Sequence, residues 1–193
     1  YSGGLYSPAE RRFFGFATAR ITDPSGAYRD LAYTQHVADA DGTLASTHER
    51  RSDGGLMRYA TTTFVRSGNG TTVPLRSLPS RIYQFACDGD ATCKSRSRGF
   101  TYSAYGAIAS EIDYGDDNVV GDERATFRTQ LVNATAFITQ LDTTVVVRTG
   151  TTSAGTQLAR TVLTYDGVAG AAPSRGLITE TARDAILTID AAA

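Results

Sequence analysis

The chain has 193 residues, of which 41% are hydrophobic and 20% are charged, and its net charge is -1. This length is enough for one sizeable core or for part of a larger one. The near-neutral charge gives no global field that would recruit nucleic acid or an anionic membrane, and no apolar run approaches the roughly 18 residues of a transmembrane helix. The first residue is Tyr and no signal peptide is present, so we expect a fragment or a processed piece of a larger protein.

Short strand-like segments alternate with turn sequences along the first half of the chain. The segment Asp23-Pro24-Ser25-Gly26 is a strong turn signal, and Asp53-Gly54-Gly55 is a second hairpin signal. Pro74 and Pro79 favour an irregular connector over residues 71–80. The strands predicted in this half cover residues 14–21, 28–37, 44–51, 56–66 and 81–86.

The second half continues the same pattern. Residues 99–105 are predicted to pair with residues 81–86 across a short loop between two cysteines, and one weak helix signal covers residues 133–139. The other predicted strands cover residues 108–114, 125–131, 137–141, 144–149, 158–165 and 176–181. Short strands at a spacing of roughly 8–12 residues predict an all-β, mostly antiparallel fold. We expect residues 1–193 to form a single β-rich segment.

Three phenylalanines surround a glycine near the start of the chain, directly after a charged run. Phe13, Phe14 and Phe16 flank Gly15 in the block ERRFFGF. The residues alone favour a core strand with a charged start. Because successive strand residues face opposite sides, we expect Phe14 and Phe16 to share one face and Phe13 to take the other.

A Tyr-Asp pair forms the centre of a second motif. Tyr165, Asp166 and Gly167 follow one predicted strand, and residues 176–179 begin the next. Residues 100–108, FTYSAYGAI, look like a degenerate copy in which Ser103 stands where the Asp would be. In such a turn the Asp side chain caps backbone groups, Gly supplies a positive φ, and Tyr packs on the neighbouring hairpin.

The ERRFFGF block, followed by many short strands and then Tyr-Asp turns, resembles the tyrosine-aspartate (YD) repeat, Rhs-like proteins. Among these it is most similar to the B component of bacterial insecticidal toxin complexes. The resemblance implies antiparallel strands and hairpins that form part of a larger YD-repeat β-shell. Such a shell encapsulates a C-terminal toxic polypeptide and helps to deliver it. The implied partners are the rest of the shell polypeptide, the enclosed cargo and other toxin-complex subunits, in a secreted or cell-surface bacterial protein.

Two cysteines, Cys87 and Cys93, are the only ones in the chain. Their spacing is too wide for a CxxC redox motif, and a zinc site would need a second pair. A local disulfide and two free thiols on a hairpin both remain open from the sequence.

Catalytic and metal-binding signals are weak. His36 and His48 lie away from any GxSxG elbow, so we expect both to be structural. The acidic clusters favour turn chemistry, with calcium as the alternative at Asp116, Asp117 and Asp122. No phosphate-cradling motif is present. We therefore expect no enzyme activity, no cofactor, no catalytic or metal site, no nucleic-acid partner and no membrane insertion by this segment.

The alternative function is a secreted β-domain that binds a glycan or a cell-surface protein. Its tyrosines could supply an aromatic platform, although the absence of Trp weakens the case for sugar binding. A hydrolase with an acid pair in a cleft of a β-scaffold is a further alternative. The candidate platform tyrosines are Tyr28, Tyr33, Tyr59, Tyr102, Tyr105 and Tyr114.

Overall fold

The computed structural model describes residues 1–9, 11–35, 43–67, 76–87, 89, 92–133, 135–168 and 173–185. Every regular element among these residues is a β-strand, and none of them is helical. The all-β, antiparallel class predicted from strand and turn spacing is therefore confirmed. The weak helix signal over residues 133–139 is wrong: Asn133 ends one strand, Ile138 begins the next, and the described residues between them form a turn.

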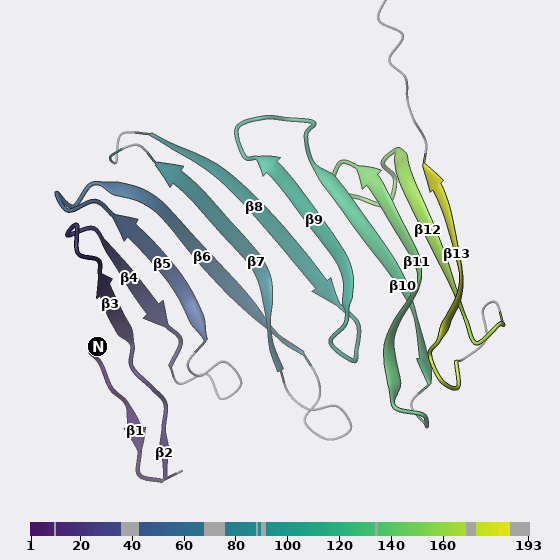
Figure 1. Ribbon diagram of the computed structural model, residues 1–193, viewed down its shortest axis with the longest axis horizontal. Helices are drawn as coiled ribbons and strands as arrows, with labels where there is room; N and C mark the ends of the chain where they lie inside the picture. The colour runs from purple at the N-terminus through teal and green to yellow at the C-terminus, as the bar shows by residue number, and fades with distance from the viewer. Residues whose placement is uncertain are drawn as a thin grey trace, which may run out of the picture. The chain divides into compact units, whose positions relative to one another are not determined.

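Eleven of the thirteen strands form an antiparallel meander, in which strand order equals chain order (Figure 1). Strands β1 (Tyr6–Ser7) and β2 (Arg12–Phe13) form a separate short hairpin. The meander consists of β3 (Thr18–Thr22), β4 (Tyr28–Tyr33), β5 (Leu44–Arg50), β6 (Leu56–Ser67), β7 (Arg76–Cys87), β8 (Cys93–Tyr102), β9 (Ile108–Asp116), β10 (Arg124–Asn133), β11 (Ile138–Thr149), β12 (Gln157–Tyr165) and β13 (Ile178–Ala185).

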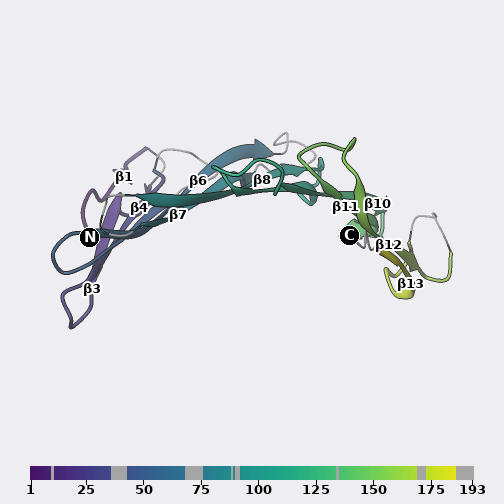
Figure 2. The same ribbon diagram turned by 90° about the horizontal axis from the view of Figure 1, so that it is seen from above.

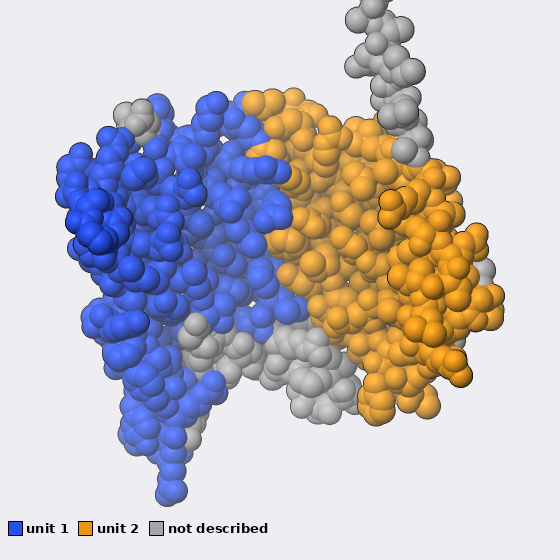
Figure 3. All heavy atoms as spheres, in the orientation of Figure 1, with its two compact units in different colours: residues 1–99, 116–118 blue, residues 100–115, 119–193 orange. Residues whose placement is uncertain are grey.

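The chain divides into two compact units, coloured separately in Figure 3. Unit 1 comprises residues 1–99 and 116–118, and unit 2 comprises residues 100–115 and 119–193. Unit 1 contains β1 to β7 and most of β8, whereas unit 2 contains most of β9 and all of β10 to β13. Each unit is described by itself below.

Three hairpins close with the same five-residue turn. In each turn the first residue donates its N–H to the carbonyl of the fifth, and a glycine at the fourth position donates back to the first carbonyl. These glycines, Gly26, Gly54 and Gly106, have φ values of 86°, 90° and 80°. The pattern is a type I turn followed by a left-handed glycine that forms a bulge, a common three-residue hairpin loop. The turns span residues 23–27, 51–55 and 103–107.

The ERRFFGF block differs from its prediction. Residues 14–17 are not in a strand, because Gly15 adopts a φ of 84° and breaks the extended backbone between β2 and β3. Phe13 and Phe16 consequently meet, with ring centroids 5.5 Å apart in an edge-on arrangement. Phe14 is only 8% exposed, whereas Phe13 and Phe16 are 53% and 40% exposed. The expectation that Phe14 and Phe16 share a face is therefore wrong, since it assumed an unbroken strand.

The predicted connector over residues 71–80 is wrong in its second half, because β7 begins at Arg76 and contains Pro79. Pro79 pairs with Phe64 next to a register shift between Thr63 and Phe64. A proline is tolerated in a sheet at such an irregularity, where a ladder hydrogen bond is already missing. The predicted pairing across the cysteine loop is confirmed, with β7 and β8 in register from Arg81↔Gly99 to Cys87↔Cys93.

Very few side chains are buried in either unit. Within each unit the strands of the meander lie side by side in one layer, which Figure 2 shows from above. Among the described residues, the buried hydrophobic side chains are Phe14, Ala19, Ala107, Ala125 and Tyr165. A sheet normally buries at least one face against another layer, so most of the stabilisation of these units comes from ladder hydrogen bonds and cross-strand pairs.

Candidate functional site

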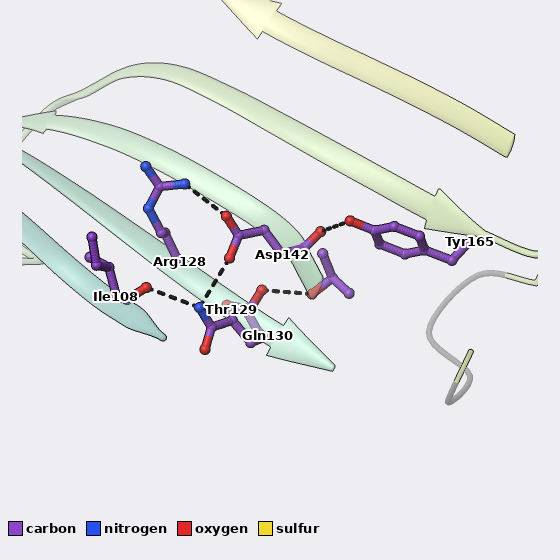
Figure 4. A network of polar contacts seen from close by, with 7 residues as sticks. Ile108, Arg128, Thr129, Gln130, Asp142 and Tyr165 are labelled. Atoms are coloured by element: carbon purple, nitrogen blue, oxygen red, sulfur yellow. Dashed lines mark hydrogen bonds and ion pairs between the residues drawn. The ribbon is translucent and has the colours of Figure 1, made fainter. Parts of the chain in front are cut away.

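The Tyr165–Asp166 turn of unit 2 combines a buried ring with a capped carboxylate. Tyr165 ends β12 and is 4% exposed, and its hydroxyl donates a hydrogen bond of 2.8 Å to the backbone carbonyl of Asp142 (Figure 4). Burial, followed by the nearby charge of Asp142, raises the pKa of Tyr165. The Tyr165 side chain therefore connects the end of β12 to β11, as the Tyr of a Tyr-Asp turn is expected to do.

The Asp166 carboxylate closes the loop that follows. Its Oδ2 accepts backbone N–H groups from Ser174, Arg175 and Gly176 at 2.7, 2.9 and 3.2 Å, and its Oδ1 accepts that of Leu177 at 3.1 Å. The Arg175 hydrogen bond, with those from Leu177, Gly176 and Ser174, lowers the pKa of Asp166 to about 2. Asp166 itself has a φ of 55°, in the left-handed region that Asp tolerates better than most residues. The turn predicted here is confirmed.

A polar network that was not predicted from the sequence lies next to the turn. Asp142 receives Arg128 Nη1 at 2.7 Å and Gln130 Nε2 at 3.1 Å, and the same Gln130 nitrogen donates to the Ile108 carbonyl at 3.0 Å (Figure 4). The β10–β11 register shifts between Thr129 and Gln130, which places Gln130 opposite Asp142. A lone carboxylate within the strand sequence LDTTVVV was the signal that could have pointed to Asp142.

Unit 1 carries a stack of aromatic rings across three neighbouring strands. His48, Tyr59 and Phe85 occupy directly paired positions on β5, β6 and β7. The His48 and Tyr59 ring centroids lie 5.5 Å apart with planes 9° from parallel, and those of Tyr59 and Phe85 lie 3.9 Å apart at 8°. Since stacked rings cover one another's faces, Tyr59 has its two faces against His48 and Phe85.

This arrangement does not favour the aromatic platform of a glycan-binding site. A sugar packs on an open ring face, whereas the faces of Tyr59 are covered and the guanidinium of Arg20 lies 4.1 Å from the centre of the Tyr28 ring. The other candidate tyrosines are divided between the units. Tyr33 belongs to unit 1, and Tyr102, Tyr105 and Tyr114 belong to unit 2.

The structure describes one of the two histidines, His48. His36 lies outside the described residues. His48 faces Asp30 across the β4–β5 pair, but the Asp30 carboxylate is bound by Arg20 Nε at 2.6 Å and Nη2 at 2.8 Å. The ring of His48 stacks on Tyr59 instead. These contacts are those of a packed structural histidine.

The acidic turns make local hydrogen bonds. Asp116 Oδ1 accepts the backbone N–H and the side-chain amide of Asn118, each at 3.0 Å, and these bonds lower the pKa of Asp116. Asp117 accepts a bond of 3.1 Å from the buried hydroxyl of Ser97. Asp122 belongs to the other unit. Within the described ranges, no group of three or more His, Cys, Asp or Glu could hold a metal ion. Four further acids in predicted turns, Asp39, Asp41, Asp88 and Asp90, lie outside the described residues.

Cys87 and Cys93 form a disulfide between directly paired positions of β7 and β8, with their Cα atoms 4.1 Å apart. The bond closes the end of this hairpin, which decides between the disulfide and the two free thiols that the sequence left open. Disulfides persist mainly in oxidising compartments.

No family model matches this chain. No curated protein matches it either. In the part of the chain that the structure describes, no helix is long and apolar enough to cross a membrane.

Proposed function

We propose that this chain is a wall segment of a YD-repeat-type β-shell that encapsulates a toxic polypeptide and helps to deliver it. The observation that carries the proposal is the Tyr165–Asp166 turn. Its buried tyrosine, its carboxylate bound by four backbone N–H groups and its left-handed Asp166 supply the roles that a Tyr-Asp repeat requires of these two residues. The partners are the rest of the shell polypeptide, the enclosed cargo and other toxin-complex subunits.

The thinness of the sheet supports the same role. A single layer with few buried side chains is poorly stabilised as a separate domain, but it suits a wall that continues into further strands. The Cys87–Cys93 disulfide fits a secreted or cell-surface protein. On this proposal the chain contains and presents another polypeptide and catalyses no reaction.

The test compares two neighbouring phenylalanines in the assembled shell protein. Phe14→Asp places a charge at a position that is 8% exposed, whereas Phe13→Asp makes the same substitution at one that is 53% exposed. Removing a buried aromatic ring and burying a carboxylate in its place are both unfavourable. We expect Phe14→Asp to expose the enclosed polypeptide to added protease, and Phe13→Asp to leave it protected.

The proteolysis pattern can contradict the proposal in two ways. A wild-type protein whose presumed cargo is cleaved as fast as that of Phe14→Asp has no containing wall. A preparation in which this chain is folded but encloses no polypeptide leads to the same conclusion. A glycan array then tests the alternative binding module, for which the covered ring faces of Tyr59 give no support.

A further inference from the structure

Gly89 lies between the two bonded cysteines and contacts a neighbouring turn of unit 1. Its backbone N–H donates a hydrogen bond of 3.2 Å to the carbonyl of Leu56, the first residue of β6. The last pair of the β6–β7 register is Arg58↔Ala86, so this bond lies beyond the ladder that joins the two strands. Gly89 therefore connects the closed end of the β7–β8 hairpin to the point where the turn at residues 51–55 enters β6.

The two backbones approach closely because glycine stands on both sides of the contact. A methyl group at Gly55 would lie 3.7 Å from the Gly89 Cα, and one at Gly89 would lie 3.3 Å from Nη2 of Arg51. Gly89 also adopts a φ of 67°, in the left-handed region that favours glycine. Arg51 and Gly55 are the two ends of the turn, which the Arg51 N–H closes with a hydrogen bond of 2.9 Å to the Gly55 carbonyl. Gly89 thus suits this turn by its conformation and by its size.

The Cys87–Cys93 disulfide holds the backbone on both sides of Gly89. It joins the last pair of the β7–β8 register, which extends back to Arg81↔Gly99. The last pair of a ladder frays first, because its hydrogen bonds are supported from one side only. A covalent bond at this pair prevents that fraying and leaves Gly89 two residues from a fixed point. The disulfide therefore lowers the entropy cost of placing Gly89 against Leu56.

The disulfide lies where a reductant can reach it. Cys87 and Cys93 are half-buried, and they end a hairpin of a sheet that buries few side chains. A dithiol can supply two electrons and two protons to the S–S bond, which breaks to give two cysteine thiols while the dithiol becomes a disulfide. Oxidising compartments preserve such a bond, whereas cytosolic thiols reduce it. The state of the bond therefore follows the compartment that the protein occupies.

We propose that the Cys87–Cys93 disulfide is a redox switch that holds Gly89 on the turn at residues 51–55 and releases it on reduction. With the bond intact, the hydrogen bond to Leu56 and the contact between glycines keep this turn closed. With the bond reduced, the end of β7–β8 frays and the turn opens more often. The switch concerns unit 1 alone and goes beyond the wall function, since it needs no enclosed polypeptide.

The test is amide hydrogen exchange of the complete chain, measured by NMR with and without dithiothreitol. The reporters are the amides of Gly89, Arg51 and Gly54, which donate the backbone hydrogen bonds of the contact and of the turn. The control is the turn at residues 103–107 of unit 2, which has the same hydrogen-bond pattern. We expect reduction to accelerate exchange about tenfold at Gly89, in line with a disulfide that closes a short loop, and by a smaller factor at Arg51 and Gly54. Exchange in the control turn should not change.

Two variants separate the bond from the contact that it supports. Cys87→Ala/Cys93→Ala should exchange like reduced wild-type protein and should not respond to dithiothreitol. Gly89→Ala keeps the disulfide but strains the left-handed backbone, so its Arg51 and Gly54 amides should exchange faster even in the oxidised protein. Circular dichroism checks folding, and Gly89→Ala and reduced wild-type protein carry the test if the double variant does not fold.

Three results would overturn the proposal. One is exchange at Arg51 and Gly54 that reduction leaves unchanged. Another is equal acceleration in the turn at residues 103–107, which would show that reduction destabilises the chain generally. The third is a Gly89→Ala protein whose Arg51 and Gly54 amides exchange as in the wild type. None of these results alters the protease comparison of Phe13 and Phe14, so the two proposals fail separately.

Discussion

The hairpins β7–β8 and β12–β13 are closed by different chemistry. The first ends in the Cys87–Cys93 disulfide after an unbroken register. The second ends after a register shift at Tyr165. There the Asp166 carboxylate accepts hydrogen bonds from the backbone N–H groups of Arg175 and Leu177, just before β13. A covalent closure needs no particular protonation state, whereas the carboxylate closure accepts its hydrogen bonds as an ionised group. We therefore expect the first closure to respond to reductant and the second to acid.

Truncating the ring of Tyr165 should have the largest effect and should be confined to the carboxylate-closed hairpin. Tyr165→Ala is expected to destabilise unit 2 by about 3–5 kcal/mol, the usual cost of removing a buried aromatic side chain. Tyr165→Phe keeps the ring and loses the hydrogen bond to the Asp142 carbonyl, at a cost of about 1 kcal/mol. Chemical denaturation measures both, with hydrogen exchange to locate the loss.

Equal losses in the two Tyr165 variants would show that the hydroxyl and not the ring holds the turn. Faster hydrogen exchange in β7–β8 as well as in β12–β13 would show that the two closures are coupled. The two hairpins could then not be treated as independent.

Removing the disulfide should have an intermediate effect on the other side of the comparison. The cysteines are six residues apart in sequence. Closing so short a loop stabilises a fold by about 2 kcal/mol in the chain-entropy description. We expect Cys87→Ala/Cys93→Ala to lose about that amount in denaturation. Reduced wild-type protein should match the double variant, which should itself be insensitive to reductant. Reductant that weakened the double variant equally would show that the loss does not come from this bond.

Of the changes at these two closures, acid should produce the smallest, and it should act on the Asp166 turn. The folded pKa of about 2 lies below the ordinary value of 3.8, so ionised Asp166 favours the folded turn. This contribution is complete above the ordinary pKa and is lost as the pH falls through the folded value. NMR should show the Arg175 and Leu177 amide signals moving in that window. They should not do so in Asp166→Asn, and reductant should not shift the transition. A transition centred near the ordinary carboxyl pKa would contradict the capping geometry.

Features that depend on neighbouring residues could be predicted from the sequence. The turns at residues 23–27 and 51–55 carry their glycines in the sequence itself, and the Tyr165–Asp166 turn is equally local. The polar network could not be predicted, because Gln130 meets Asp142 only after a register shift that no residue type announces.

The errors near Phe14 and Pro79 have related causes. Strand alternation fails where a single glycine takes a positive φ, as at Gly15. The rule that proline interrupts a strand fails beside a register irregularity, where a proline is tolerated, as at Pro79. The aromatic stack could not be foreseen either, since it requires His48, Tyr59 and Phe85 to be aligned across three strands.

The recurring glycine-bulge turn at Gly26, Gly54 and Gly106 has a consequence for how such a chain can change in length. A hairpin closed by this turn contributes two strands, an even number, so its duplication or deletion leaves the direction of every later strand unchanged. Gain or loss of one strand would instead reverse all that follow and put their loops at the opposite end. Descendants of this sequence should therefore differ in length by whole hairpins, so that the number of strands changes by two at a time.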